Sequence, residues 1–266
     1  MRHIISFAPA GDLVAVNRTG LYTRAGASVV RGQITGFSAR SRSRLQRKIA
    51  LLRRTSLPVF LTLTYPADYP GDMVSVKGHL KRFWDWMADH YSDYGAIWKL
   101  EFQARGAPHF HSFLWGVPVA DYPKIALAWC RIVDSDDENH LRWHMGELGN
   151  GNKPCMEQIR SWFGCKKYAS KEMGKDSQNP NFDASIGRVW GVRGEVPFSP
   201  VLQFSMDVDD VLEFKKLYAE RLGLEIKSFS FWGYGYHVDF LLWVFERLEY
   251  RSGCPPNFPP GWDEDL

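Results

Sequence analysis

The stretch "WKLEFQARGAPHFHSFLWG", residues 98–116, decides the fold. Polar and apolar residues alternate on both sides of the dipeptide "RG", and this pattern is typical of two strands joined by a tight turn. We therefore expect strands at 96–104 and 107–115 that form an antiparallel hairpin. The hairpin is the centre from which the rest of the sequence can be interpreted.

The second strand of this hairpin carries two histidines one residue apart. Because successive side chains of a strand point to opposite faces, His109 and His111 share one face and Phe110 points to the core. Two such imidazoles can converge on one divalent ion, although a surface or hydrogen-bonded pair is the simpler interpretation of the motif alone. The facing strand offers Glu101 and Gln103 as oxygen ligands. We favour Glu101, because its charge helps to neutralise the cation, and this set leaves open positions, as catalytic sites do.

The flanking sequence predicts an α+β fold around an antiparallel sheet. A strand in "PVFLTLTYP", residues 58–66, directs Leu61 and Leu63 to the core and Thr62 and Thr64 to the opposite face. The segment after residue 153 is typical of a short strand that runs into a helix, or of a helix alone. The other predicted elements are helices at 75–91, 121–133 and 207–222, and a polar loop at 134–153.

The segment "SARSRSRLQRKIALLRR", residues 38–54, predicts a basic amphipathic helix. Leu45, Ile49 and Leu52 recur at helical spacing, and no acidic residue occurs. A solvated helix face and a phosphate-binding face are both compatible with this pattern. Candidates for phosphate contacts are Arg44, Arg47 and Lys48.

Composition excludes several classes of protein. The 266 residues include 45% hydrophobic residues and carry a net charge of +3, which predicts a globular protein with a real core and no extreme charge. The four cysteines form no CxxC pair, so we expect neither a zinc ribbon nor a disulfide framework. No signal peptide and no membrane-length apolar run is evident. We expect a cytoplasmic protein that does not contact a membrane.

The segment "CKKYASKEMGK", residues 165–175, places Tyr168 and Lys171 three apart, on one side of a predicted helix. Phenols titrate near pH 10 and are poor nucleophiles at neutral pH unless a cation stabilises the phenolate. Lys171, together with Lys167, would also grip a phosphate. A purely structural tyrosine is the alternative for this motif when it is considered alone.

Taken together, "FLTLTYP", "EFQARGAPHFHSFLWG" and "YASK" resemble, in order and spacing, the three motifs of HUH endonucleases that initiate rolling-circle replication in bacteriophages and plasmids. The resemblance runs from about residue 40 to about residue 192 and includes "GRVWG". It implies an RRM-like or ferredoxin-like antiparallel sheet flanked by helices. It also implies that Mg²⁺ or Mn²⁺ is bound by His109, His111 and the residue at the Glu101 position.

The same resemblance implies the reaction and its partners. Tyr168 would attack a phosphodiester of a single-stranded DNA origin, leaving a 5′-phosphotyrosine and a 3′-hydroxyl that primes replication. The enzyme would act as a monomer or weak dimer in a bacterial host cell, with a host helicase and polymerase, because no GxxxxGK[ST] motif is present. Gly164, four residues before Tyr168, indicates a single-tyrosine enzyme. The DNA contacts would include Arg44, Arg47, Lys48, Thr62, Thr64, Lys167 and Arg188.

The expected organisation has an N-terminal lead-in at 1–38, an endonuclease domain at 39–195 and a C-terminal extension at 196–266. Three alternatives remain. One is a single-tyrosine HUH transposase, although such enzymes are usually shorter; a relaxase is disfavoured because its tyrosine precedes the histidines. Another is a metal-dependent phosphodiesterase that uses water. The third is a binding protein without catalysis, in which the histidines are incidental.

Overall fold

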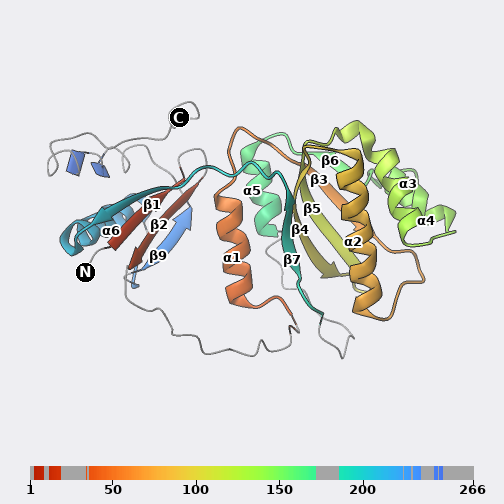
Figure 1. Ribbon diagram of the computed structural model, residues 1–266, viewed down its shortest axis with the longest axis horizontal. Coiled ribbons are helices and arrows are strands. Elements are labelled where there is room, and N and C mark those ends of the chain that lie inside the picture. Colours follow the sequence, from red (N-terminus) through yellow and green to blue (C-terminus); the bar gives the residue numbers. More distant parts are fainter. Residues whose placement is uncertain are drawn as a thin grey trace. The chain divides into compact units, whose positions relative to one another are not determined.

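The computed structural model describes residues 3–8, 12–18, 34, 36–171, 186–223, 225–228, 230–234, 243–244 and 246–247. The chain divides into two compact units, each built from separate segments (Figure 1). The first unit contains Met1–Val30, Arg47–Thr55 and Phe198–Leu266. The second contains Arg31–Gln46 and Ser56–Pro197.

The second unit is organised around a five-stranded sheet in which every neighbouring pair is antiparallel. In spatial order the strands are β6 (Met156–Gln158), β3 (Val59–Thr64), β5 (Pro108–Trp115), β4 (Gly95–Phe102) and β7 (Trp190–Gly194). The β4–β5 hairpin is the one that the alternation around "RG" predicts, and Gly106, with φ of 87°, supplies the left-handed turn conformation. The expected α+β fold with an antiparallel sheet is confirmed.

Helices cover both faces of this sheet (Figure 1). On one face lie α2 (Met73–His90), a 3₁₀ turn η1 (Val119–Asp121), α3 (Tyr122–Ile132) and α4 (Glu138–Met145). On the other lie α5 (Trp162–Lys171) and the first part of α1 (Ala39–Ala50). Helix α2 begins where the Asp72 side chain accepts a hydrogen bond from the Ser75 amide at 2.8 Å, a standard N-cap.

The core of the second unit lies between the sheet and helices α2 and α3. Leu61, Leu63 and Phe110 are completely buried there, as the strand alternation predicts. Phe110 makes edge-to-face contacts with Trp98 and Trp129, at centroid distances of 6.4 and 6.0 Å. Because this packing fixes which face of β5 is internal, it also fixes both histidines on the opposite face.

The first unit has a four-stranded antiparallel sheet packed on one helix. In spatial order the strands are β8 (Leu202–Met206), β1 (His3–Phe7), β2 (Leu13–Arg18) and β9 (Phe231–Tyr234), and the helix is α6 (Val208–Leu222). The helix expected near 207–222 is confirmed, and the Asp207 side chain caps it by accepting from the Asp210 amide at 3.0 Å. Phe7 packs edge-to-face against Phe214 in the core of this unit.

One predicted element is wrong. The segment 134–153, expected as a polar loop, contains α4. Asp137 caps this helix by accepting from the Asn139 amide at 2.9 Å, and Gly146 ends it with φ of 77°. The two end signals were present in the sequence, but the polar composition between them hides the helix.

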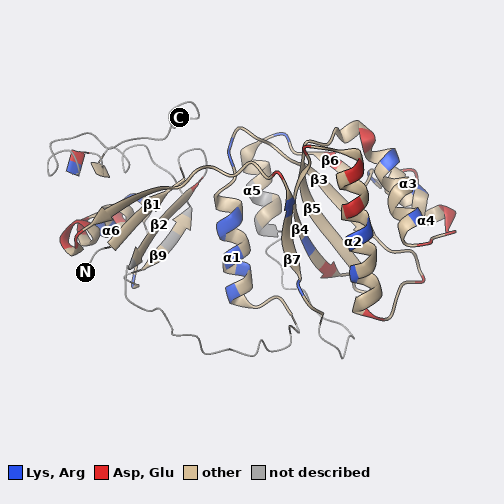
Figure 2. Ribbon diagram, in the orientation of Figure 1, with Lys and Arg blue, Asp and Glu red and all other residues tan. Residues whose placement is uncertain are grey.

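None of the helices in the described ranges combines the length and the apolar character that crossing a bilayer requires. Figure 2 shows that α1 carries lysine and arginine without acidic residues, whereas α2 carries charges of both signs. The expected basic helix is therefore present, and it spans Ala39–Ala50.

Candidate functional site

The sheet face opposite α2 brings the predicted metal ligands into register. Across the β4–β5 hairpin, Glu101 pairs with His109 and Lys99 with His111. On the other side of β5, Thr62 pairs with His111. Cross-strand partners lie on the same face, so three adjacent strands supply one continuous polar patch in a sheet that is otherwise apolar.

The two imidazoles converge. Nε2 of His109 lies 3.0 Å from Nε2 of His111, and the ring centroids are 4.3 Å apart. Two nitrogens that each lie about 2.1 Å from one metal ion, at a right angle, would be about 3.0 Å apart. The donor pair therefore fits an octahedral divalent cation without rearrangement of the backbone.

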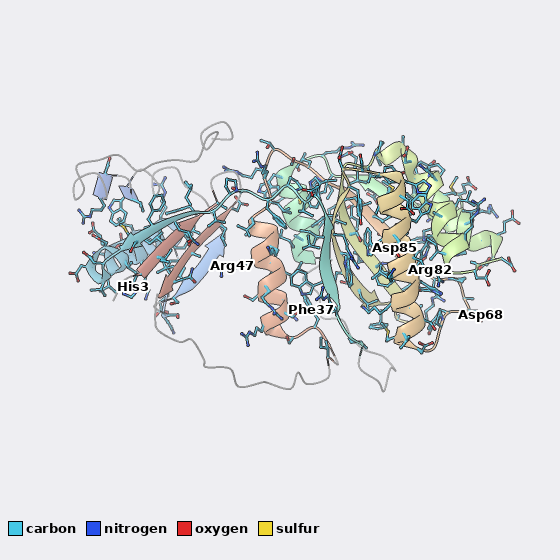
Figure 3. The ribbon with its side chains drawn as sticks, viewed as in Figure 1. His3, Phe37, Arg47, Asp68, Arg82 and Asp85 are labelled. Carbon is cyan, nitrogen blue, oxygen red and sulfur yellow. The ribbon has the colours of Figure 1, made fainter. Side chains whose placement is uncertain are left out.

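Glu101 completes the patch. Its Oε2 atom lies 3.7 Å from His111 Nε2, and its Oε1 atom accepts from Lys99 Nζ at 2.6 Å. Lys99 is completely buried, and its ammonium also lies 4.9 Å from the ring centroid of Phe37, labelled in Figure 3. A carboxylate held in this way presents its second oxygen on the side of the histidines.

Gln103, the other oxygen ligand considered from sequence, occupies a different position. Arg105 Nε donates to Gln103 Oε1 at 2.9 Å, which turns the amide nitrogen towards His109 Nδ1, 3.3 Å away. Nδ1 is the imidazole nitrogen that faces away from the histidine pair. Gln103 therefore orients His109, whereas Glu101 lies beside the converging nitrogens.

The hydrogen bonds around the pair define the proton positions. His111 Nδ1 lies 3.2 Å from Thr62 Oγ1. Since the Gln103 amide nitrogen is a donor, His109 accepts at Nδ1 and donates from Nε2 to His111, which in turn donates from Nδ1 to Thr62. When both Nε2 atoms bind a cation, His109 must carry its proton on Nδ1, and the Gln103 amide must present its oxygen to it.

Tyr168 lies on the same face, on α5. Its ring packs on Phe60 at a centroid distance of 4.7 Å, and the other neighbour of Phe60 is His111, stacked at 5.2 Å. The Tyr168 hydroxyl lies 3.5 Å from Glu157 Oε2 on β6. One phenyl ring therefore separates the phenol from the histidine pair, and its hydroxyl faces a carboxylate that sequence reasoning missed.

The remaining predicted contacts are dispersed. Lys167 and Lys171 lie on α5, but their side chains fall outside the described part of the structure. Arg44 is exposed on the part of α1 in the second unit; Lys48, in the first unit, lies 4.8 Å from the Phe198 ring centroid. The other predicted contacts are Arg47 on α1, Thr64 beside His109 in register, and Arg188 ahead of β7.

A second group of histidines supports the site from the edge of β3. β6 pairs only with the first half of β3, and beyond it His144 Nε2 accepts from the Thr64 amide at 3.2 Å while His140 Nε2 donates to the Thr64 carbonyl at 2.9 Å. Burial lowers the pKa of His144 to about 3, so the ring is neutral. These side chains satisfy the backbone of the residue that faces His109.

Cys130 joins these histidines in a buried group whose candidate ligand atoms lie within 4.8 Å of one another and could hold a metal ion. The four imidazole nitrogens of the group already take part in hydrogen bonds, to Thr64, to Ser135 or Cys130, and to the carbonyl of His140. We therefore interpret the group as a structural clamp on β3. The i, i+4 spacing in "HLRWH" was the available sequence signal.

Comparison with known proteins gives one match. Residues 58–177 match the model of a family described as Replication-associated protein, of the ORF2 type. This segment contains the histidine pair, Glu101, Glu157 and Tyr168, and the match supports a replication-initiator family and a role in DNA replication. Neither the curated proteins nor the solved structures yield a significant match.

Proposed function

We propose that the protein is an HUH-type endonuclease that nicks and rejoins single-stranded DNA at a replication origin through a 5′-phosphotyrosine intermediate. The observation that carries the proposal is the convergence of His109 and His111 beside Glu101, with Tyr168 one ring away on the same sheet face. The replication-associated family match over this segment supports it. The two lines of support are independent, because the geometry does not enter the sequence match.

The chain would hold Mg²⁺ or Mn²⁺ through both Nε2 atoms and Glu101 Oε2. Such an ion, when bound, polarises the scissile phosphate and stabilises the charge that develops on it. Thr62 and Gln103 fix the two imidazole rings from behind, which is the usual second layer of a metal site. Lys99 holds one oxygen of Glu101 and orients its second oxygen.

The proposed reaction exchanges one phosphate ester for another. The Tyr168 oxygen forms a bond to phosphorus, the bond from phosphorus to the 3′ oxygen breaks, and that oxygen leaves as a hydroxyl after taking up a proton. The phenol proton passes to a base, and Glu157 is the carboxylate nearest to it among the described residues. A later 3′-hydroxyl reverses these steps and joins the strand.

The wider context follows from a single-tyrosine enzyme. Lys167 and Lys171 would contact the phosphate, and Arg44, Arg47, Lys48, Thr62, Thr64 and Arg188 would contribute to DNA binding. A second protomer or water would complete the second strand transfer. We place the reaction in the cytoplasm of a bacterial host, with the host helicase and polymerase as partners.

The deciding experiment mixes the full chain with Mn²⁺ and a pool of single-stranded oligonucleotides and searches for an adduct that survives SDS. Tyr168→Phe should abolish the adduct. Tyr91→Phe is the matched control, because the Tyr91 hydroxyl also donates to a carboxylate, that of Asp121, but outside the site. EDTA should stop cleavage, and His109→Ala should slow it by orders of magnitude.

Other outcomes separate the alternatives. An adduct that persists in Tyr168→Phe would refute the nucleophile. Cleaved DNA without any adduct would identify a phosphodiesterase that uses water. DNA binding without cleavage would favour a binding protein.

A further inference from the structure

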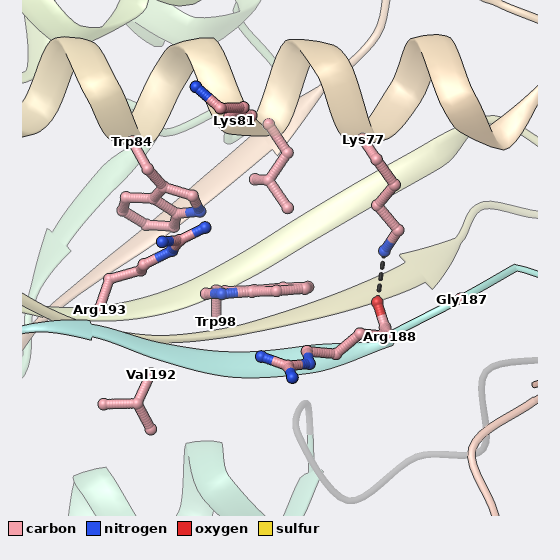
Figure 4. A pocket seen from close by; sticks show the side chains of 9 residues that line it. Lys77, Lys81, Trp84, Trp98, Gly187, Arg188, Val192 and Arg193 are labelled. Carbon is pink, nitrogen blue, oxygen red and sulfur yellow. Dashed lines mark hydrogen bonds between the residues drawn. The ribbon is translucent and has the colours of Figure 1, made fainter. Parts of the chain in front are cut away.

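A basic pocket of about 330 Å³ lies on the sheet face opposite the histidines. It is lined by α2 on one side and by β4, β7 and the residues before β7 on the other (Figure 4). Its volume is in the lower part of the range of small-molecule sites, about 300–1,000 Å³. Strand alternation separates it from the candidate active site, because Trp98 faces the pocket whereas Lys99 faces the histidines.

Cations dominate the lining. Lys77, Lys81, Arg188 and Arg193 contribute four positive charges, and none of the described lining residues is acidic. Lys81 is paired with Asp85 at 2.5 Å on the outer surface of α2. The other three are not paired with a carboxylate in the lining, which is an unfavourable arrangement for a pocket that binds nothing.

Lys77 is the most constrained of these cations. Its ammonium donates to the Arg188 carbonyl and lies 5.1 Å from the ring centroid of Trp98 (Figure 4). Burial, and then the charge of Arg188, lowers the pKa of Lys77 to about 8. An anion in the pocket would offset both effects, because it would neutralise the charge that burial disfavours.

The aromatic walls point to the same kind of ligand. Trp84 is 2% exposed, and among the described residues its Nε1–H has no hydrogen-bond acceptor. Figure 4 shows this nitrogen directed into the space beside the Arg193 side chain. A buried donor without an acceptor is costly, on the order of 1–3 kcal/mol, and a ligand oxygen would satisfy it.

The opposite wall is shaped to leave this space open. The Trp98 indole lies flat against Gly191 of β7, where a Cβ atom would be only 2.9 Å from the indole nitrogen. Only glycine allows this approach. The indole therefore forms a firm wall, between the β7 backbone and the Lys77 ammonium.

We propose that this pocket is a phosphate-binding site, in which Lys77, Arg188 and Arg193 neutralise the anion and Trp84 donates a hydrogen bond to one of its oxygens. The phosphate belongs either to a DNA strand or to a free nucleotide; the chemistry of recognition is the same. The site does not depend on the nicking reaction, because it lies on the other face of the sheet.

Binding is tested in the Tyr168→Phe background with EDTA present, so that no cleavage can contribute. One arm measures the affinity for a short fluorescent single-stranded oligonucleotide over a range of salt; the other measures dAMP and inorganic phosphate. Arg193→Gln should weaken oligonucleotide binding about 3–10-fold and reduce the salt slope by about 1, if the phosphate belongs to a strand. If it belongs to a nucleotide, dAMP binding falls instead.

Arg131→Gln is the control, because Arg131 is an exposed arginine on α3 outside the pocket. Trp84→Phe keeps an aromatic ring but removes the donor, and should weaken the same arm by a similar factor. Arg193 is exposed, so its variant tests the site even if Trp84→Phe proves unstable. Equal binding by Arg193→Gln and Arg131→Gln in both arms would overturn the proposal.

Discussion

The hydroxyl of Tyr168 lies 3.5 Å from Oε2 of Glu157. Glu157 is opposite Phe60 in the β3–β6 ladder, and Phe60 carries the Tyr168 ring on one side and the His111 ring on the other. The phenol, its carboxylate partner and the histidine pair are thus attached to neighbouring positions of one rigid sheet. Their spacing is set by strand register, which makes each contact accessible to single substitutions.

Glu157→Gln should slow adduct formation at neutral pH by about 100-fold, the lower end of the range for loss of a general base. The defect should shrink at alkaline pH, where the phenol ionises without help. Single-turnover rates over a pH series measure both effects. Glu138→Gln, on the exposed first turn of α4, is the control. An unchanged rate would leave Glu157 only the role of holding the Tyr168 ring.

Gln103→Glu should tighten Mn²⁺ binding about tenfold, because a carboxylate accepts the proton that His109 must carry on Nδ1 when Nε2 is a ligand. Gln103→Leu should weaken it. Isothermal titration of the full chain gives the affinities directly. Gln158→Glu, at a glutamine on β6 whose amide donates to the Pro58 and Ile159 carbonyls, controls for the added charge. Equal affinities for Gln103→Glu and the parent protein would exclude this role.

Lys99→Met should lower the free energy of unfolding by about 3–5 kcal/mol in EDTA, because it leaves Glu101 as a partly buried carboxylate without its ammonium partner. The double variant with Glu101→Gln should recover much of this loss. Urea denaturation of both single variants and the double variant completes the cycle. If the two substitutions are simply additive, the ion pair does not carry the coupling that its geometry implies.

The stability of the second unit should fall in acid through His144. Burial lowers the pKa of this ring from its ordinary value of 6.5 to about 3, so between these values the unfolded chain binds more protons than the folded one. The free energy of unfolding therefore rises with pH across that window and is lost as pH falls through it. Denaturation at pH 7.5 and pH 5 measures the difference.

His144→Gln should reduce this difference, since a glutamine oxygen can accept from the Thr64 amide but does not titrate. His140, whose pKa is also lowered by burial, keeps part of the effect. His90→Gln, at the exposed end of α2, should leave the pH dependence unchanged. A full pH dependence in His144→Gln would assign the effect to other groups.

Local patterns predicted much of the second unit. Alternation around "RG" predicted the hairpin, its inward face and the shared face of His109 and His111, because these depend only on neighbouring residues. The helix that carries Tyr168 follows a short strand, which was one of the two possibilities considered. The identity of the chemistry required the order of all three motifs, since each alone has a structural explanation.

What local patterns missed depends on distant contacts. Helix α4 is polar, and much of its anchoring comes from His140 and His144, which bind the backbone of Thr64. The pocket on the opposite face joins residues of α2 to residues about a hundred positions later, so no sequence window contains it. Glu157 was overlooked for the same reason, because only strand register places it beside the phenol.

The order of the strands in the first sheet has a consequence for synthesis on the ribosome. β1 lies between β2 and β8, so one of its edges stays unpaired until residues 202–206 have been translated. Every strand of the second sheet precedes that point. A nascent chain that stalls before residue 202 would carry a finished catalytic sheet and an open β1 edge, which is a template for pairing with other chains.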